Sequence, residues 1–356
     1  MRVVFRVDAS LEIGIGHVMR CLSLAEVLTN HGADVEFICR NHKGNLIHNI
    51  RSSGFTVLEL ELPREKQSDN NLSHANWLCT TQHQDASDCM KKLKQSKVDW
   101  LIVDHYGIDQ YWQNSLKEYY DKLMVIDDLA DRSHVCDILL DQNFGRKEHD
   151  YKELVPKSCE ILLGSKYALL RAEFAKWRKY SLERRKNPKF KKILVSMGGI
   201  DAENITGKVL EELRLCNLPQ DIFVVIVMGG TAPHLESIKQ MVNNLPYKAE
   251  IKVNIDNMAE IMANVDVAIG AAGSTTWERC CLGLPTIQIV IAKNQKIFAE
   301  ILLRKNAIKL IQEVEELSNI LKSANSWMEN ISDIAREISD GLGSIRVANI
   351  LIQKRI

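Results

Sequence analysis

Short runs of apolar residues recur along the chain, and most of them end in a loop that carries glycine or a polar residue. An amphipathic stretch with apolar positions at helical spacing usually follows. Strands that alternate with helices form parallel βαβ units, and near-continuous apolar runs are typical of strands buried on both faces. The pattern predicts an α/β fold. In the first half, we expect strands at residues 2–7, 33–39, 55–60, 100–104, 123–127, 137–141 and 160–164.

A second series of strands follows the basic, proline-containing segment LERRKNPKFKK at residues 182–192. We interpret this segment as a linker between two doubly wound, Rossmann-like domains, residues 1–181 and 193–356, that face a cleft. Open sheets of this kind bind ligands beyond the carboxyl ends of their strands. The second series of expected strands comprises residues 193–199, 222–230, 250–255, 265–274 and 286–291, and the last stretch, 344–356, predicts a helix.

Composition agrees with two domains and narrows the class of partner. The chain has 356 residues, of which 46% are hydrophobic, and 46 basic residues balance 46 acidic ones. No basic stripe interleaved with aromatic residues is present, so we expect a small molecule as partner and no nucleic acid. The nine cysteines are scattered and include the adjacent pair Cys280 and Cys281, which favours reduced thiols.

Neither a metal site nor a membrane segment is expected from the sequence. Cysteine and histidine spacings typical of zinc sites do not occur. The first residues read as a short strand that contains arginines, and no apolar run approaches about 20 residues. We therefore expect a cytoplasmic protein without membrane insertion, and the sequence leaves its oligomeric state open.

The strongest local signal is VDVAIGAAGSTTWERCCLGLPTIQIV at residues 265–290, a strand followed by a loop of small residues and a helix. Gly273 allows close approach to the backbone, and Ser274 with Thr275 could donate to an anion or simply cap the helix. One turn further, Glu278 could accept both hydroxyls of a ribose, or be a surface residue that favours the first turn. We favour a phosphate and ribose site.

Paired glycines follow two other expected strands. Gly198 and Gly199 could let backbone N–H groups reach a pyrophosphate, or could serve only a tight turn. For Gly229 and Gly230 the structural explanation is favoured. Asn294, just after the strand at 286–291, is a candidate polar group at the cleft, with a loop cap as the alternative.

The segment GIGHVMRC at residues 14–21 suggests a dinucleotide-binding loop, but Met19 stands where the G-x-G-x-x-G motif requires its third glycine. The next strand also ends in Arg40 rather than in an acid, so the dehydrogenase interpretation is poor. His17 instead begins a helix, whose positive end disfavours an imidazolium, and we expect a neutral imidazole that accepts a proton. Position alone equally allows a histidine that only starts the helix.

Other polar residues lie at expected strand ends on the same side of the first sheet. Carboxylates there could orient His17, bind sugar hydroxyls or cap loops. Asp127, Asp128 and His105 are among these residues. The candidates for the sugar or the cleft are Asp8, Gly14, Gly16, Asp104, Tyr106 and Asn294.

These segments together resemble a known family. The chain resembles the hydrolases of pseudaminic acid biosynthesis, which act on UDP-2,4-diacetamido-2,4,6-trideoxy-β-L-altropyranose and are similar in fold to GT-B glycosyltransferases. Its second half also looks like the UDP-binding half of the lipid II synthase that adds N-acetylglucosamine. The resemblance rests on FRVDAS, GIGHVMRCLSLA, LIVDHYGID, VIDDLADR, LLDQN, LLGSKYALLR, SMGGID and GAAGSTTWERCCLGLP, which occur in this order over most of the chain.

The resemblance implies a GT-B-like fold, uridine as the base and cleavage of the anomeric C–O bond with inversion, without a cofactor or a metal ion. His17 matches the family's catalytic histidine, which positions or activates the attacking water. Two other classes remain as rivals: a glycosyltransferase with a separate acceptor, and a sensor that binds a nucleotide-sugar without consuming it. The positions that match the family's UDP site are Gly198, Gly199, Gly273, Ser274, Thr275 and Glu278.

Overall fold

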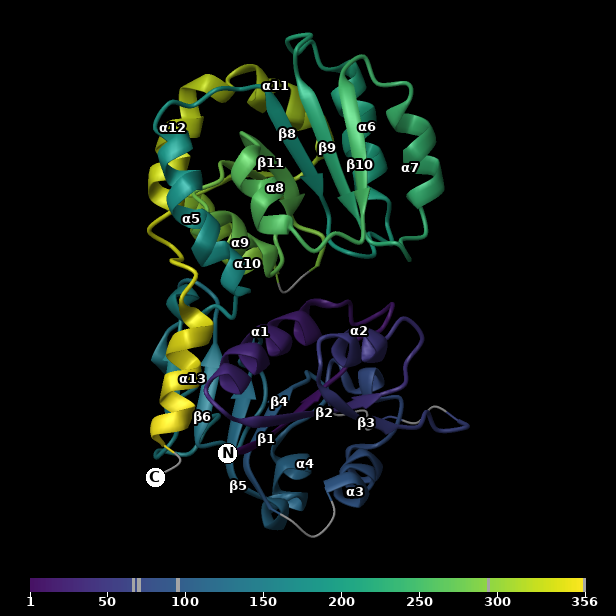
Figure 1. Ribbon diagram of the computed structural model, residues 1–356, viewed down its shortest axis with the longest axis vertical. Coiled ribbons are helices and arrows are strands. Elements are labelled where there is room, and N and C mark those ends of the chain that lie inside the picture. The colour runs from purple at the N-terminus through teal and green to yellow at the C-terminus, as the bar shows by residue number, and fades with distance from the viewer. Residues whose placement is uncertain (66–67, 69–71, 94–96, 293–294, 355–356) are drawn as a thin grey trace. The chain divides into compact units, whose positions relative to one another are not determined.

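The computed structural model describes residues 1–65, 68, 72–93, 97–292 and 295–354. The chain forms two compact units, the first comprising Met1–Leu169 and Gly343–Ile356 and the second Leu170–Leu342. Each unit contains one parallel sheet with helices packed against it (Figure 1). The α/β class predicted from the apolar pattern is therefore confirmed.

The sheet of the first unit has seven strands in the order β3-β2-β1-β4-β5-β6-β7. The order reverses between β1 and β4, which pair in parallel although two strands separate them in the chain. Such a switch point is where doubly wound sheets bind ligands. The strands are β1 Arg2–Val7, β2 Asp34–Arg40, β3 Thr56–Leu60, β4 Val98–Asp104, β5 Tyr120–Ile126, β6 Ile138–Asp141 and β7 Glu160–Leu163.

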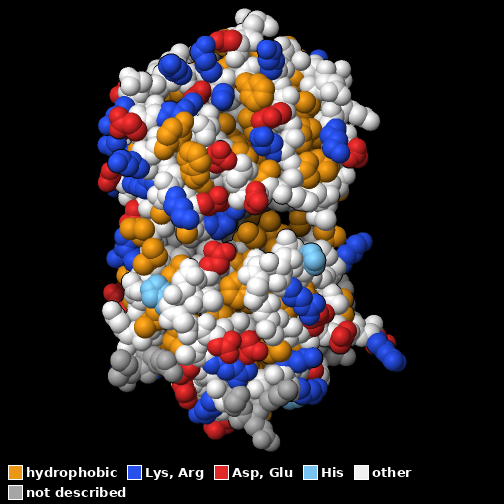
Figure 2. Space-filling model, in the orientation of Figure 1, with side chains coloured by type: hydrophobic (Ala, Val, Ile, Leu, Met, Phe, Trp, Pro, Cys, Tyr) orange, Lys and Arg blue, Asp and Glu red, His pale blue; other side chains and the backbone are white. Residues whose placement is uncertain are grey.

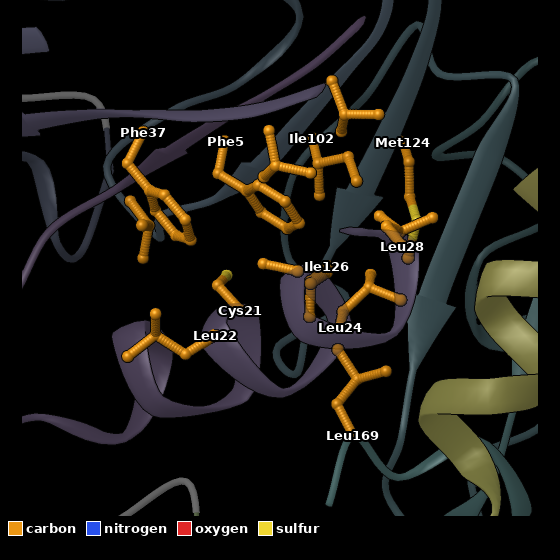
Figure 3. Packing of buried hydrophobic residues seen from close by; sticks show 14 of the residues in the cluster. Phe5, Cys21, Leu22, Leu24, Leu28, Phe37, Ile102, Met124, Ile126 and Leu169 are labelled. Carbon is orange, nitrogen blue, oxygen red and sulfur yellow. The ribbon is translucent and has the colours of Figure 1, made fainter. Parts of the chain in front are cut away.

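Helices cover both faces of this sheet because alternate residues of each strand point to opposite sides. Phe5 packs in the hydrophobic cluster on the side of helix α1, whereas its neighbour Val4 packs in the cluster on the side of α3 and α4 (Figure 1). Figure 3 shows Leu24 and Leu28 of α1 directed toward strand residues of the first cluster. The helices of this unit are α1 Gly16–Asn30, α2 Ile47–Ser52, α3 Gln82–Leu93, α4 Gln110–Ser115 and α13 Gly343–Gln353.

The sheet of the second unit has six strands in the order β10-β9-β8-β11-β12-β13, with its switch point between β8 and β11. Its strands are β8 Lys192–Ser196, β9 Phe223–Met228, β10 Lys248–Val253, β11 Val267–Ala271, β12 Thr286–Ile289 and β13 Lys309–Ile311. Its helices are α5 Ala172–Arg185, α6 Ile205–Leu215, α7 Leu235–Val242, α8 Met258–Asn264, α9 Thr275–Cys281, α10 Lys296–Arg304, α11 Leu317–Lys322 and α12 Ala324–Ala335.

The division between the units lies at residue 170 rather than in the expected linker at 182–192. Residues 172–181 of α5 were assigned to the first domain, but the helix belongs to the second unit. Its Arg185 donates there to the carbonyl oxygens of Met262, Val265 and Leu282. The basic run at 182–192 was expected to be a solvated linker, but its residue Arg185 is buried in the second unit.

The final helix also belongs to a different unit than expected. Residues up to 356 were assigned to the second domain, but α13 packs against α1 in the first unit. Leu351 is fully buried there, and the indole N–H of Trp100 on β4 donates to its carbonyl oxygen at 3.1 Å.

Charged side chains of both signs are interspersed over the face of each unit that Figure 2 shows, in agreement with the equal numbers of basic and acidic residues. Within the described parts of the chain, no helix combines the length and the apolar character that crossing a membrane requires.

Candidate functional site

His17 is placed by a tight turn between β1 and α1. Gly14 has a φ of +80°, which favours glycine, and its N–H donates to the carbonyl oxygen of Ser10 at 2.9 Å. Gly16 is the first residue of α1, so His17 stands in the first turn of the helix. The glycines thus shape the loop that carries His17 to the carboxyl end of β1, at the switch point of the sheet.

Asp104 ends β4, the neighbour of β1, and its Oδ1 lies 2.6 Å from His17 Nδ1. Burial alone would raise the pKa of Asp104, but the Arg20 guanidinium and His17 hold it well below its usual range. An ionised carboxylate only accepts hydrogen bonds, so Nδ1 carries the proton that His17 donates to Asp104. When the imidazole is neutral, its lone pair is then on Nε2, and the hydrogen-bond contacts of His17 with described side chains are made through Nδ1.

Arg20, one turn after His17, fixes this pair. Its guanidinium makes two contacts of 2.6 Å with the carboxylate of Asp104 and a third of 2.6 Å with Oδ2 of Asp128. The phenol of Tyr106 donates to the same Asp128 oxygen at 2.6 Å. The two carboxylates therefore hold Arg20 between them, and Arg20 holds Asp104 against His17. Both carboxylates were expected near His17 from their places at strand ends, whereas Arg20 was not.

An aromatic group surrounds the imidazole. The rings of His17 and Tyr106 meet edge to face with centroids 4.7 Å apart, and Trp77 stacks on Tyr106 at 5.2 Å. His74 contacts Trp77 at 4.6 Å. Trp77 lies in the short 3₁₀ helix η1, Ala75–Leu78, and the sequence offered no signal for it beyond an aromatic residue in a polar segment. His17 thus has a carboxylate on one side and an apolar wall on the other.

Asp8 does not join this group. Its fully buried carboxylate contacts Arg6 Nη1 at 2.7 Å and accepts the N–H of Arg40 at 2.7 Å. Burial raises the pKa of Asp8, but Arg6 lowers it well below its usual value. Asp8 is therefore held by a buried ion pair with Arg6 of its own strand and by the backbone of Arg40 at the end of β2. Asn294, the other cleft candidate, lies outside the described residues.

In the second unit, the loop after β11 has the open backbone that its small residues predict. A Cβ atom on Gly273 would meet only the amide nitrogen of Gln295, at 3.6 Å. Ser274 is exposed and precedes α9, but its side chain makes no capping hydrogen bond. The hydroxyl of Thr275 accepts a hydrogen bond from Arg279 at 3.2 Å. Ser274 therefore does not cap α9 through its side chain, which was the alternative to ligand binding.

Glu278 is a largely buried carboxylate without a hydrogen bond among the described residues. Its side chain is 17% exposed, and the nearest cation, Arg171, is 4.0 Å away. Burial raises the pKa of Glu278 to about 7, although Arg171 and Arg279 oppose the shift. A carboxylate in this condition has both oxygens available to accept hydroxyl donors.

The loop after β8 lies beside this site, because β8 and β11 are neighbours in the sheet. Gly198 has a φ of +94°, and a Cβ atom on it would meet nothing within 4 Å. In contrast, a Cβ atom on Gly229 would lie 2.1 Å from the carbonyl oxygen of Gly199, which confirms the structural explanation for that glycine. Asp201 accepts the N–H groups of Ile205 and Thr206, so the start of α6 is capped by protein groups.

The described residues contain no group of three or more histidine, cysteine or acidic side chains arranged to hold a metal ion. The chemistry-bearing side chains form two sets instead. One surrounds His17 in the first unit, and the other surrounds the loop after β11 in the second.

The sequence is similar to known proteins over most of the chain. Residues 192–339 match the glycosyltransferase family 28 C-terminal domain. An uncharacterised protein of Methanocaldococcus jannaschii is 31% identical over 291 residues, which are 81% of this chain and 55% of that protein, so the chain spans about half of its length. The UDP-2,4-diacetamido-2,4,6-trideoxy-β-L-altropyranose hydrolase of Campylobacter jejuni subsp. jejuni is 29% identical over 306 residues, which cover 86% of this chain and 97% of the hydrolase.

Solved structures show the same fold at low sequence identity. MurG of Acinetobacter baumannii superposes with a TM-score of 0.71 and 16% identity, covering 99% of each chain. UDP-GlcNAc 2-epimerase from Neisseria meningitidis, bound to UDP-GlcNAc, gives a TM-score of 0.61 with 13% identity over 99% of this chain and 100% of the epimerase. The chain thus has a GT-B-like fold and is similar in sequence to the Campylobacter altropyranose hydrolase over most of its length.

Proposed function

We propose that the protein hydrolyses UDP-2,4-diacetamido-2,4,6-trideoxy-β-L-altropyranose to UDP and the free sugar, in pseudaminic acid biosynthesis. The observation that carries this proposal is the contact of 2.6 Å between His17 and Asp104, which leaves Nε2 available as a base. The hydrolase of Campylobacter jejuni, aligned along nearly its whole length, supports the choice of substrate.

The first unit supplies the base for the attacking water. Nε2 of His17 takes a proton as the water oxygen forms a bond to C1 of the sugar, on the face opposite UDP. The electron pair of the breaking C1–O bond passes to the β-phosphate oxygen, so the anomeric centre is inverted. Asp104 stabilises the imidazolium that forms, in the way that a carboxylate serves the histidine of a hydrolytic triad.

The second unit supplies the nucleotide site. Glu278 accepts the two ribose hydroxyls, while the backbone around Gly198, Gly199 and Gly273 and the hydroxyls of Ser274 and Thr275 donate to the diphosphate. UDP is a good leaving group once such donors stabilise the negative charge of its diphosphate. The general acid of an ordinary glycosidase is therefore not needed, and one base suffices.

A glycosyltransferase is the second candidate, and the match to the family 28 C-terminal domain favours it. In that case His17 would take the proton of an acceptor hydroxyl instead of water. In a sensor that binds UDP-sugar without turnover, the hydrogen-bonded pair of His17 and Asp104 would have no chemical role.

The discriminating experiment is incubation of the protein with the UDP-sugar alone, followed by proton NMR. The proposal predicts that UDP and free sugar accumulate in equal amounts without any acceptor. Release of UDP only after an acceptor is added would favour the transferase. Tight binding of UDP without any consumption of UDP-sugar would favour the sensor.

A further inference from the structure

Arg279 lies beneath the loop that follows β11. Its guanidinium is buried, with 2% of the residue exposed, and reaches back from α9 toward the end of the strand. It donates to the carbonyl oxygen of Ala271 at 2.6 Å and to the hydroxyls of Thr275 and Thr276 at 3.2 Å each. The cation is therefore in direct contact with the residues that shape the loop.

The same guanidinium lies next to Gly270 of β11, whose partner in the sheet is Ser196 at the end of β8. A Cβ atom on Gly270 would lie 2.6 Å from Nη1 of Arg279 and 2.8 Å from the carbonyl oxygen of Ser196, the last residue of β8. Glycine at this position lets the cation, β8 and β11 converge. Since Ser196 directly precedes the loop with Gly198 and Gly199, Arg279 lies near the start of both loops at the switch point of the sheet.

No carboxylate among the described residues lies within 4 Å of this guanidinium, and its Nε atom is buried without a hydrogen-bond partner. Burial lowers the pKa of Arg279 to about 10, partly offset by Cys280 and Glu278, so the side chain remains charged at neutral pH. An unpaired charge in such a place is costly unless an anion compensates it.

Comparison with other buried arginines supports this interpretation. Arg20 and Arg6 contact carboxylates directly. Arg185 contacts no carboxylate among the described residues. Its Nε, Nη1 and Nη2 atoms instead all donate to backbone carbonyl oxygens. Arg279 combines a missing carboxylate with an unsatisfied donor, beneath a loop whose open backbone suits an anion.

We propose that Arg279 is a positioning residue for the diphosphate of the nucleotide, an assignment that rests on the proposed function. By donating into the Thr275 oxygen, it turns the Thr275 hydroxyl hydrogen away from itself and toward a phosphate oxygen. Its charge also compensates the diphosphate through the thin glycine-rich loop. Arg279 therefore favours ligands that carry a diphosphate over the nucleoside alone.

The test compares binding of UDP and uridine to the full chain by calorimetry. Arg279→Met, which keeps the length of the side chain and removes the charge, is expected to weaken UDP binding by about tenfold or more. Uridine binding should change by less than about twofold, because uridine has no phosphate. Arg304→Met serves as the control for net charge, since Arg304 is 73% exposed on α10.

An equal loss of affinity for both ligands, or no loss for either, would overturn the inference. Should Arg279→Met fail to fold, Arg279→Gln decides the question, since it keeps a hydrogen-bond donor for the loop, removes the charge and is expected to weaken UDP binding selectively. Failure of the wild-type protein to bind either ligand would instead refute the nucleotide site itself. The two failures are therefore distinguishable.

Discussion

His17 Nδ1 lies 2.6 Å from Asp104 Oδ1, although 87 positions separate the two residues in the chain. The contact exists because β1 and β4 are neighbours at the switch point of the first sheet, so the loop after one strand meets the end of the other. It fixes the tautomer of the imidazole and leaves Nε2 as the basic atom. The first predictions follow from this pair.

His17→Asn is expected to lower kcat by about two to four orders of magnitude, the usual contribution of a positioned base. Affinity for UDP should remain nearly intact, because the residues proposed to bind UDP lie in the second unit. Steady-state kinetics and calorimetry on the same preparation check both parts. Near-normal turnover in this variant would remove His17 from the mechanism.

Asp104→Asn should also slow turnover, by about two to four orders of magnitude, since an amide can donate to Nδ1 and so favour the wrong tautomer. Asp131→Asn is the matched control. It makes the same chemical change at a carboxylate that is 43% exposed and contacts Arg132 rather than the His17 group. Equal kcat values for the two variants would show that Asp104 does not act through His17.

The raised pKa of Glu278 predicts that nucleoside binding depends on pH. Its pKa is raised by burial to about 7, so the carboxyl is mostly protonated at pH 6 and mostly ionised at pH 8. The ionised form accepts both ribose hydroxyls, and uridine affinity should therefore rise as the pH rises through 7. Uridine is the better ligand for this titration because it has no phosphate that titrates in the same range.

Glu278→Gln is the control for that experiment, because its amide does not titrate. Uridine affinity of this variant should be lower than wild type at pH 8 and should vary little between pH 6 and pH 8. If the variant retains the wild-type pH profile, another group causes the dependence, and Glu278 is not the ribose acceptor.

The position of the last helix predicts a stability difference. Leu351 is fully buried in the core of the first unit, whereas Ile345 on the same helix is 43% exposed. Leu351→Ala should lower the free energy of unfolding of the first unit by about 2–5 kcal/mol, and Ile345→Ala should change it much less. Chemical denaturation of the two variants measures the difference, and similar values would contradict the packing of α13 on the first unit.

The sequence predicts most of the strands because buried parallel strands carry apolar runs that local composition makes visible. It misses β13, whose three residues, Lys309–Ile311, are too few to form a recognisable pattern. It also misplaces the division between the units. Neither the docking of α13 nor the burial of Arg185 has a local signal, because both depend on contacts with distant segments.

The residues of the candidate site also fall into those that the sequence predicts and those that only the structure shows. His17, Asp104, Tyr106 and Glu278 stand at strand ends or helix starts, where the α/β pattern directs the search. Arg20 and Arg279 lie inside helices among apolar neighbours, and only the structure shows which carboxylate or loop each one contacts. Trp77 comes from a short 3₁₀ helix that no periodicity predicts.

Hydrolysis of the UDP-sugar in oxygen-18 water, with products followed by mass spectrometry and proton NMR, shows which atom the water attacks. We expect the label in the free sugar, with the opposite anomer formed first. Label in UDP would show attack at phosphorus and would contradict the role given to His17.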